Sequence, residues 1–292
     1  FVAAAVHGDE INGVEIIRRL LKLRTLRSLR GTLLAVPVVN VLGFLNMSRY
    51  LPDRRDLNRS FPGSERGSAA ARLANLFVTE IVDKADYGID LHTGAIHRAN
   101  LPQIRADLDH EETRELASAF GVPVMINASV REGSLRELAA SRDVPLLLYE
   151  AGEALRFDEL AIRAGVRGIQ QVMRRLGMLP AGKSKRRESR PVTALDSGWI
   201  RSPQSGIVHA TVRLGDYVKK GDVIANVRDP LGSSDTVIQA ADDGVVIGLS
   251  KLPLAHEGDA IVHVAAFNQP TRVARSVEAF HRGHGGDEPT TG

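Results

Sequence analysis

The chain contains no cysteine. Disulfide bonds and thiolate zinc sites are therefore excluded, so any metal ion must be bound by His, Asp or Glu. The absence of disulfides fits a reducing compartment, and we expect a cytoplasmic protein. No apolar run approaches the roughly 20 residues of a membrane-spanning helix, and the short apolar start has neither a basic flank nor a cleavage pattern. We therefore expect a soluble protein with no membrane partner.

Aromatic residues are few, at 4% with a single Trp, and the net charge is only +3 over 292 residues. One basic run, Lys183–Arg187, is typical of a solvated linker, because no aromatic platform or nucleic-acid-binding module accompanies it. We therefore expect no nucleic-acid partner. The remaining composition, 43% hydrophobic and 25% charged, suits a globular chain long enough for two domains. The sequence begins without Met inside a predicted strand, so we expect preceding residues that are absent from it.

Residues 1–178 alternate between apolar runs of strand length and helical patterns. Strands are predicted at 2–6, 32–39, 87–91, 103–106, 123–127 and 145–149, and helices at 13–24, 69–84, 109–120, 134–141 and 158–176. This alternation predicts an α/β fold with a mixed, largely parallel sheet flanked by helices. In such sheets, ligands bind at the carboxyl ends of the strands.

The composition changes after this region. Residues 179–195 are rich in Gly, Ser, Pro, Lys and Arg, which predicts a linker. Residues 196–270 carry short apolar runs between Gly- and Asp-rich turns, which predicts a small all-β domain. Residues 271–292 have no core-forming pattern, and we expect a flexible tail.

The tetrapeptide His7-Gly8-Asp9-Glu10 lies where a small-residue strand gives way to a helix. Side chains three residues apart on a helical turn have Cβ atoms roughly 5–6 Å apart. His7 and Glu10 can therefore converge on one metal ion, while Gly8 suits a crowded turn. The alternative is that Asp9 or Glu10 caps the helix, since carboxylates are favoured at that end. A metal site thus needs a third ligand from elsewhere, and His92 and Glu150 also follow predicted strands.

Five motifs together resemble the succinylglutamate desuccinylase and aspartoacylase family of the zinc carboxypeptidase group. They are His7-Gly8-Asp9-Glu10, Ser48-Arg49-Tyr50, Asp56-Leu57-Asn58-Arg59-Ser60-Phe61-Pro62-Gly63, Asp90-Leu91-His92-Thr93-Gly94 and Tyr149-Glu150-Ala151-Gly152-Glu153. The resemblance extends over residues 1–176, and the order of the motifs makes it more specific than any single motif.

The resemblance implies one zinc ion per chain, with His7, Glu10 and His92 as ligands and the fourth position left for water. It implies that Glu150 is the general base that takes a proton from this water. Each residue also has a structural alternative: His92 as a satisfied strand-end histidine, and Glu150 as a cap of the following turn. Glu153 competes with Glu150 as the base, but Glu150 directly follows the predicted strand.

The resemblance also implies substrate contacts in the long polar loop at residues 40–67. Arg49 would polarise the scissile carbonyl, Asn58 and Arg59 would bind the substrate carboxylate, and Asp56 would order the loop or a ligand. Taken alone, Arg59 could equally be a surface ion-pair partner. Two further arginines are weaker substrate-contact candidates, Arg131 and Arg136.

These features predict a zinc-dependent amidohydrolase that cleaves the amide of an N-acyl amino acid or a similar small carboxylate-bearing amide. The alternatives are a metallocarboxypeptidase acting on short peptides and a non-catalytic metal-binding module. The family's full set of acyl-recognition residues has no clear match in this sequence, so the acyl group and the amino acid stay open. Self-association into a homo-oligomer is likewise left open.

The region 199–264 resembles the barrel-sandwich shape of biotinyl and lipoyl carrier domains. Such carriers present a modified lysine on a hairpin, but the corresponding segment here, Asp229–Asp235, contains none. A covalent carrier role is therefore disfavoured, and we expect a lid, a dimerisation surface or a part that shapes the substrate site.

Overall fold

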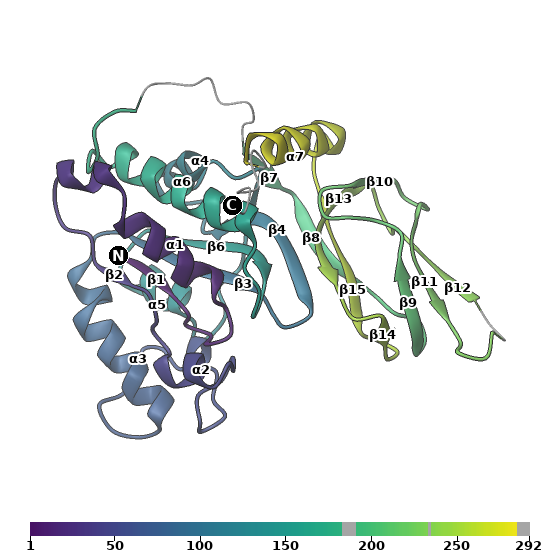
Figure 1. Ribbon diagram of the computed structural model, residues 1–292, viewed down its shortest axis with the longest axis horizontal. Coiled ribbons are helices and arrows are strands. Elements are labelled where there is room, and N and C mark those ends of the chain that lie inside the picture. The colour runs from purple at the N-terminus through teal and green to yellow at the C-terminus, as the bar shows by residue number, and fades with distance from the viewer. Residues whose placement is uncertain (183–190, 233–234, 285–292) are drawn as a thin grey trace, which may run out of the picture.

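The computed structural model describes residues 1–182, 191–232 and 235–284 (Figure 1). The basic run Lys183–Arg187 and the last residues of the expected tail lie outside the described residues. Within the described part of the chain, no helix is long and apolar enough to cross a membrane.

An eleven-stranded sheet forms the centre of the molecule, and its main path is β2-β1-β3-β6-β4-β13-β15-β8. Its N-terminal strands are β1 (Val2–Ala4), β2 (Ala35–Val36), β3 (Gly88–Gly94), β4 (Arg98–Ala106), β5 (Val124–Asn127) and β6 (Leu146–Glu153). Strands β2, β1, β3 and β6 are parallel to one another, whereas β4 runs antiparallel to β6. The expected α/β fold with a mixed, largely parallel sheet is confirmed.

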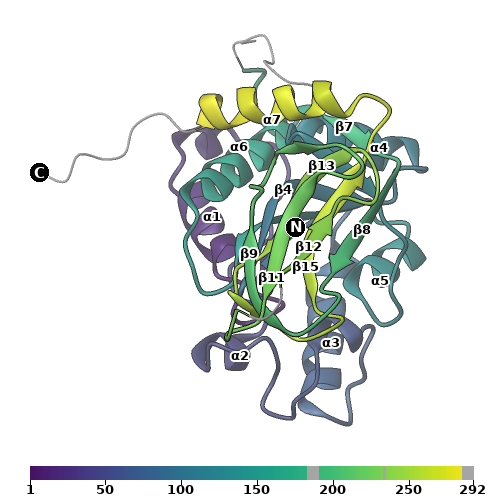
Figure 2. The ribbon, with the colours of Figure 1, turned by 90° about the vertical axis from the view of Figure 1, so that its right-hand side faces the viewer.

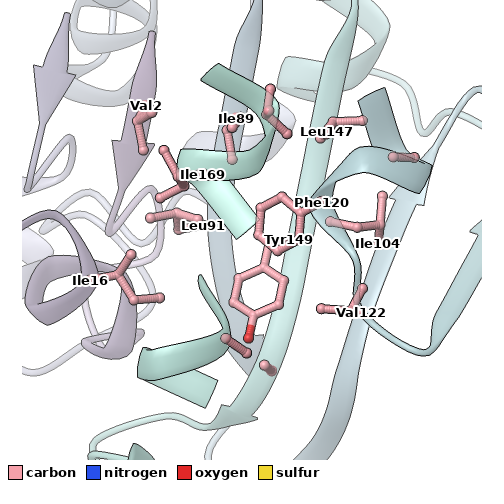
Figure 3. Packing of buried hydrophobic residues seen from close by; sticks show 14 of the residues in the cluster. Val2, Ile16, Ile89, Leu91, Ile104, Phe120, Val122, Leu147, Tyr149 and Ile169 are labelled. Carbon is pink, nitrogen blue, oxygen red and sulfur yellow. The ribbon is translucent and has the colours of Figure 1, made fainter. Parts of the chain in front are cut away.

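Helices cover both faces of this part of the sheet. On one face lie α1 (Asn12–Leu21), α4 (Glu111–Phe120) and α6 (Glu159–Arg175), and on the other α3 (Ala69–Glu80) and α5 (Leu135–Ser141). The core between the sheet and α1, α4 and α6 is called the first core here. Figure 3 shows part of it, where the ring of Tyr149 lies beside that of Phe120 with ring centroids 4.9 Å apart. Short helices complete this half at α2 (Val41–Leu45), η1 (Arg24–Ser28), η2 (Leu57–Arg59) and η3 (Val82–Lys84).

The strand expected at 32–39 is much shorter in the structure. Only Ala35 and Val36 pair in regular register with β1, and beyond Pro37 the bonding becomes irregular, with the N–H of Val39 donating to the carbonyl of Ala4 over 3.0 Å. The loop expected at 40–67 is in turn partly helical, because α2 and η2 lie within it.

The C-terminal strands do not form a separate body beside the first sheet. Strand β13 (Gly244–Ser250) pairs with β4, and β15 (Ala260–Ala266) and β8 (Asp196–Arg201) follow it. A second, four-stranded sheet contains β9 (Gly206–Ala210), β11 (Val223–Arg228), β12 (Asp235–Gln239) and β14 (Leu254–Ala255). Figure 2 shows β9, β11 and β12 face on. The short β10 (Tyr217–Val218) also pairs with β13. Likeness to a carrier domain stays a prediction.

Two expected boundaries differ in the structure. The end of the expected linker forms β7 (Val192–Ala194), which pairs in parallel with β5. The start of the expected flexible tail forms helix α7 (Pro270–His284). Its apolar residues are spaced at 273, 277 and 280, so they share one helical face, and all three are buried. Val273 and Val277 pack on the C-terminal strands, while Phe280 joins the core under α6.

We predict that Phe280→Ala lowers the free energy of unfolding by about 3 kcal/mol, because it leaves a cavity between α7 and the first core. Phe280 is only 4% exposed. The matched control is Leu231→Ala, since Leu231 is 92% exposed and its truncation is expected to change stability by less than about 0.5 kcal/mol. Urea unfolding followed by circular dichroism measures both variants. Equal stability of the two would show that α7 does not contribute to the core.

Candidate active site

A tight turn after β1 brings His7 and Glu10 together. The N–H of Glu10 donates to the carbonyl of His7 over 3.1 Å, and helix α1 begins only at Asn12. Gly8 lies against the backbone of α2, because a Cβ at this position would come within 2.0 Å of the carbonyl carbon of Gly43. The crowding expected around Gly8 is thus confirmed. The start of loop 40–67 packs directly against this turn.

Both histidines point one ring nitrogen at the same carboxylate. The Nδ1 atoms of His7 and His92 lie 2.7 Å from the two oxygens of Glu10, Oε1 and Oε2 respectively. The backbone N–H of Thr93 also donates to Oε2 over 3.0 Å, so the end of β3 orients the carboxylate. All three side chains are buried, and one ligand atom from each lies within 4.8 Å of the others. The donor set therefore fits a single metal ion.

The outer nitrogen of each ring faces a second carboxylate. His7 Nε2 lies 3.1 Å from Asp56 Oδ1, and His92 Nε2 lies 2.8 Å from Asp90 Oδ2. This pairing is typical of metal-binding histidines, where an outer carboxylate fixes the ring and makes the inner nitrogen more basic. The part played by Asp90 was missed in the sequence, although Asp90 lies two residues before His92 and so on the same side of the strand.

The electrostatics of the cluster favour added positive charge. Burial alone would raise the pKa of Glu10, but the rings of His7 and His92 outweigh it and hold this pKa well below its usual range. Burial opposes the protonation of His92, yet Asp90 and Glu10 raise its pKa well above the ordinary value.

Formal charges lead to the same conclusion. Glu10, Asp56 and Asp90 surround the rings with three negative charges. Arg49 returns one positive charge, since it contacts Glu10 Oε1 at 3.3 Å and Asp56 Oδ2 at 3.0 Å. With neutral imidazoles the cluster is left with a net charge equal and opposite to that of a divalent cation.

Asp9 does not cap helix α1. The cap position is Ile11, and no side chain makes a capping hydrogen bond there. Asp9 is instead buried, one of its carboxylate oxygens has no partner, and burial followed by the nearby Glu10 raises its pKa. The expectation that Asp9 serves as a cap is therefore wrong.

Loop 40–67 delivers the other expected residues to one cavity of about 610 Å³. Arg49, Asn58 and Arg59 all line it together with the His-Glu-His cluster. The side-chain oxygen of Asn58 accepts from the N–H of Leu135 over 2.9 Å, which ties the loop to the start of α5.

Glu150 lies beside His92. The two residues are direct partners in the parallel pairing of β3 and β6, and Glu150 lines the cavity. Glu153 does not line it and instead lies 3.6 Å from Arg156. Arg105 on the adjacent β4 places its Nε 2.6 Å from Glu150 Oε2.

The cavity wall carries many arginines and reaches into the C-terminal strands. Six arginines line it: Arg49, Arg59, Arg98, Arg105, Arg131 and Arg136. Trp199 on β8 and His263 on β15 line it as well. Sequence patterns could not join these two residues to Arg105, because the pairing of β13 with β4 that brings them together connects segments over 140 residues apart.

Known proteins resemble the chain over most of its length. N-alpha-acetyl-L-2,4-diaminobutyric acid deacetylase from Halomonas elongata is 29% identical over 275 residues, which cover 89% of this chain and 79% of that protein. The product-bound ectoine utilization protein EutE (DoeB) from Ruegeria pomeroyi superimposes with a TM-score of 0.82 at 25% identity, covering 91% of this chain and 84% of that one.

A third relative shows the fold alone. It is a succinylglutamate desuccinylase/aspartoacylase from Rhodobacter sphaeroides, with a TM-score of 0.80 at 23% identity over 91% of this chain and 85% of that one. The sequence family described as the succinylglutamate desuccinylase/aspartoacylase catalytic domain matches residues 1–176. This range includes all three residues of the His-Glu-His cluster and Glu150. The chain therefore belongs to the succinylglutamate desuccinylase/aspartoacylase family.

Proposed function

We propose that the protein is a zinc-dependent amidohydrolase that cleaves the amide of an N-acyl amino acid or a similar small carboxylate-bearing amide. The observation that carries this proposal is the buried cluster of His7, Glu10 and His92 with Glu150 as its neighbour in the sheet. A cluster that only stabilised the fold would need no open space beside it, yet these four side chains line a cavity of about 610 Å³.

Zinc suits the donor set, because two imidazoles and one carboxylate leave a coordination position free, as catalytic zinc sites do. When bound, zinc lowers the pKa of water and polarises a carbonyl group. In this chain His7, Glu10 and His92 would hold the ion, and Asp56 and Asp90 would fix the two rings.

Glu150 would act as the general base. Its place beside His92 lets its carboxylate take a proton from the attacking water and pass it to the leaving amine. Arg105, 2.6 Å away, holds this carboxylate on the cavity side of β6. Of the two glutamates considered for this role, Glu150 lines the cavity and Glu153 does not.

Arginines would bind the charged parts of the substrate. Arg49 is 27% exposed and already lies near the metal-binding carboxylate, so it can donate to the oxyanion that forms when the amide carbon becomes tetrahedral. Asn58 and Arg59 would bind the substrate carboxylate, for which the planar guanidinium is well shaped. The deacetylase from Halomonas elongata, whose name states an N-acetylated amino acid, supports a substrate of this class.

We predict that the purified protein, expressed with sufficient zinc, contains close to one zinc per chain and hydrolyses members of a panel of N-acyl amino acids. Glu150→Gln should lower kcat/KM by about 10²–10⁴-fold, because it removes the proton acceptor and keeps the side-chain shape. Elemental analysis should find zinc still bound in the variant. The matched control is Glu153→Gln, which changes a nearby glutamate outside the cavity and should keep the activity.

Two results would contradict this proposal. Zinc-free protein after zinc-replete expression would rule out the metal site, and equal activity of Glu150→Gln and wild type would rule out this base. Dipeptides belong in the same panel, because cleavage of dipeptides without cleavage of N-acyl amino acids would favour the carboxypeptidase alternative.

We also predict that Asp90→Asn weakens zinc binding by about 10–100-fold, since His92 then loses the carboxylate that orients its ring. Competition with a chromogenic chelator measures the affinity. Asp242→Asn is the control, because Asp242 is 80% exposed in the bend between β12 and β13, away from the strands that carry the cluster. An unchanged affinity in Asp90→Asn would mean that the ring is held by packing alone.

A further inference from the structure

Large apolar side chains are exposed around the turn that carries Glu10. We call eight of them the α2 face, and each is 38–69% exposed. They are Val41, Leu42, Leu45, Met47 and Tyr50 in and after α2, Ile96 in the turn between β3 and β4, and Leu155 and Phe157 after β6. None of the eight lines the cavity at the His-Glu-His cluster, so the proposed hydrolysis does not account for them.

Backbone contacts join the three segments into one surface. The turn at Gly8 packs against the backbone of α2. On the other side of this turn, the carbonyl of Asp9 accepts from the N–H of Leu155 over 2.8 Å. The N–H of Ala154 donates to the carbonyl of Gly94 over 3.0 Å, which holds the loop after β6 beside the turn between β3 and β4. The eight side chains therefore belong to one patch rather than to scattered positions.

Helix α2 presents its apolar side to solvent. Leu42 and Leu45 are three residues apart, and Val41 and Leu45 are four apart, so the three side chains share one helical face. All three are at least 47% exposed, while the backbone at Gly43 packs against Gly8. A surface helix ordinarily turns such a face toward a core. In the described part of the chain, this face of α2 points away from the core instead.

The backbone is strained at two residues of the α2 face. Met47 has a φ of 50° and Leu155 a φ of 57°, in the left-handed region that large side chains rarely adopt. Gly or Asn would adopt this conformation at a lower energetic cost. Both side chains are exposed, so packing within the chain offsets little of this cost. Strained residues that gain little inside their own chain indicate a contact with another molecule.

The charges around the α2 face favour a protein over an anionic lipid surface. In residues 41–50 and 155–157 the charged side chains are Arg49, paired with two carboxylates, and Arg156, paired with Glu153. Two further exposed arginines follow in the loop, Arg54 and Arg55. Recognition of anionic lipids takes a cluster of about four to eight lysines and arginines beside the apolar surface. The core of a protein interface, in contrast, has few charges.

The size and the neutrality of the α2 face favour a second copy of this chain. Residues of this class present on the order of 200 Å² each when fully exposed, so eight that are about half exposed present roughly 800 Å². The largest apolar patch of a typical monomer covers about 300–600 Å², whereas each partner in a stable complex contributes about 800 Å². Three of the eight residues are Met or aromatic, the types enriched in interfaces.

We propose that the α2 face is the interface of a two-fold homodimer, in which α2 of one chain packs beside α2 of the second copy. In such a dimer the same patch meets itself, which a surface without net charge allows without repulsion. A partner of another sequence would be selected by complementary charges, which this face does not offer. The proposal does not depend on the proposed hydrolysis, because association is measured without substrate.

Sedimentation velocity of the purified protein tests the association. We expect a species of twice the 31.6 kDa chain mass at micromolar concentration. Leu45→Glu should raise the dissociation constant of the dimer by about 100-fold or more, because each chain then buries a carboxylate among apolar side chains. The matched control is Leu254→Glu, since Leu254 is 65% exposed on β14, well away from α2 (Figure 1), and Leu45 is 69% exposed.

Two results would overturn the proposal. One is a wild-type protein that stays monomeric at high micromolar concentration. In that case flotation with phosphatidylcholine vesicles shows whether the α2 face binds lipid instead. The other is a dimer that is weakened equally, or not at all, by Leu45→Glu and Leu254→Glu.

Two further variants separate association from folding. Met47→Asn and Leu155→Asn remove apolar area but suit the left-handed backbone, so each should weaken the dimer by about 10-fold. Their melting temperatures should equal or exceed that of the wild type at concentrations where all the proteins are monomeric. A dimer that Leu45→Glu weakens only together with a lower melting temperature, and that neither Asn variant weakens, would overturn the proposal.

Discussion

The shared carboxylate of Glu10 is the interaction on which the rest of the site depends. A buried carboxylate is costly unless charged or polar groups surround it, and here two imidazoles and a backbone N–H do so. Those groups come from the turn after β1 and from the end of β3. Arg49 then reaches the same carboxylate from loop 40–67. The Glu10 side chain thus keeps its position only when three segments that are distant in sequence come together. Each of these segments also contributes to the cavity.

Continuity of the main sheet explains how the C-terminal half takes part in this site. A separate domain on a flexible linker would present its residues to the cavity only part of the time. Here β13 pairs directly with β4, and β7 pairs with β5, so backbone hydrogen bonds join the C-terminal half to the N-terminal strands at two places. Helix α7 then packs Phe280 into the first core. The strands that carry Trp199 and His263 are therefore part of the same hydrogen-bonded sheet as the strand that carries Glu150.

Local sequence patterns located the strands of the first half, although not the bounds of the one expected at 32–39, and they placed His7, Glu10, His92 and Glu150 at one edge of the sheet, because periodicity and strand ends are local features. They failed where long-range pairing decides the outcome. A helix at 270–284 looked like a tail since its apolar face is narrow, and it is stable only through packing against strands far away in sequence. Trp199 and His263 likewise reach the cavity through the pairing of β13 with β4.

The placement of arginines in the cavity favours ligand binding over stability. Burial first, and nearby Arg105 second, lower the pKa of Arg136, so the folded chain holds two like charges close together in a partly dry space. Arg136 compensates in part by donating to the carbonyls of Ala128 and Ser129. Glu150 offsets some of the charge of Arg105, but one carboxylate cannot balance both arginines. An anionic ligand would relieve this repulsion, and by binding only the folded chain it would also stabilise it. The part of the cavity where Arg105 and Arg136 lie close together is thus the part best suited to bind an anion.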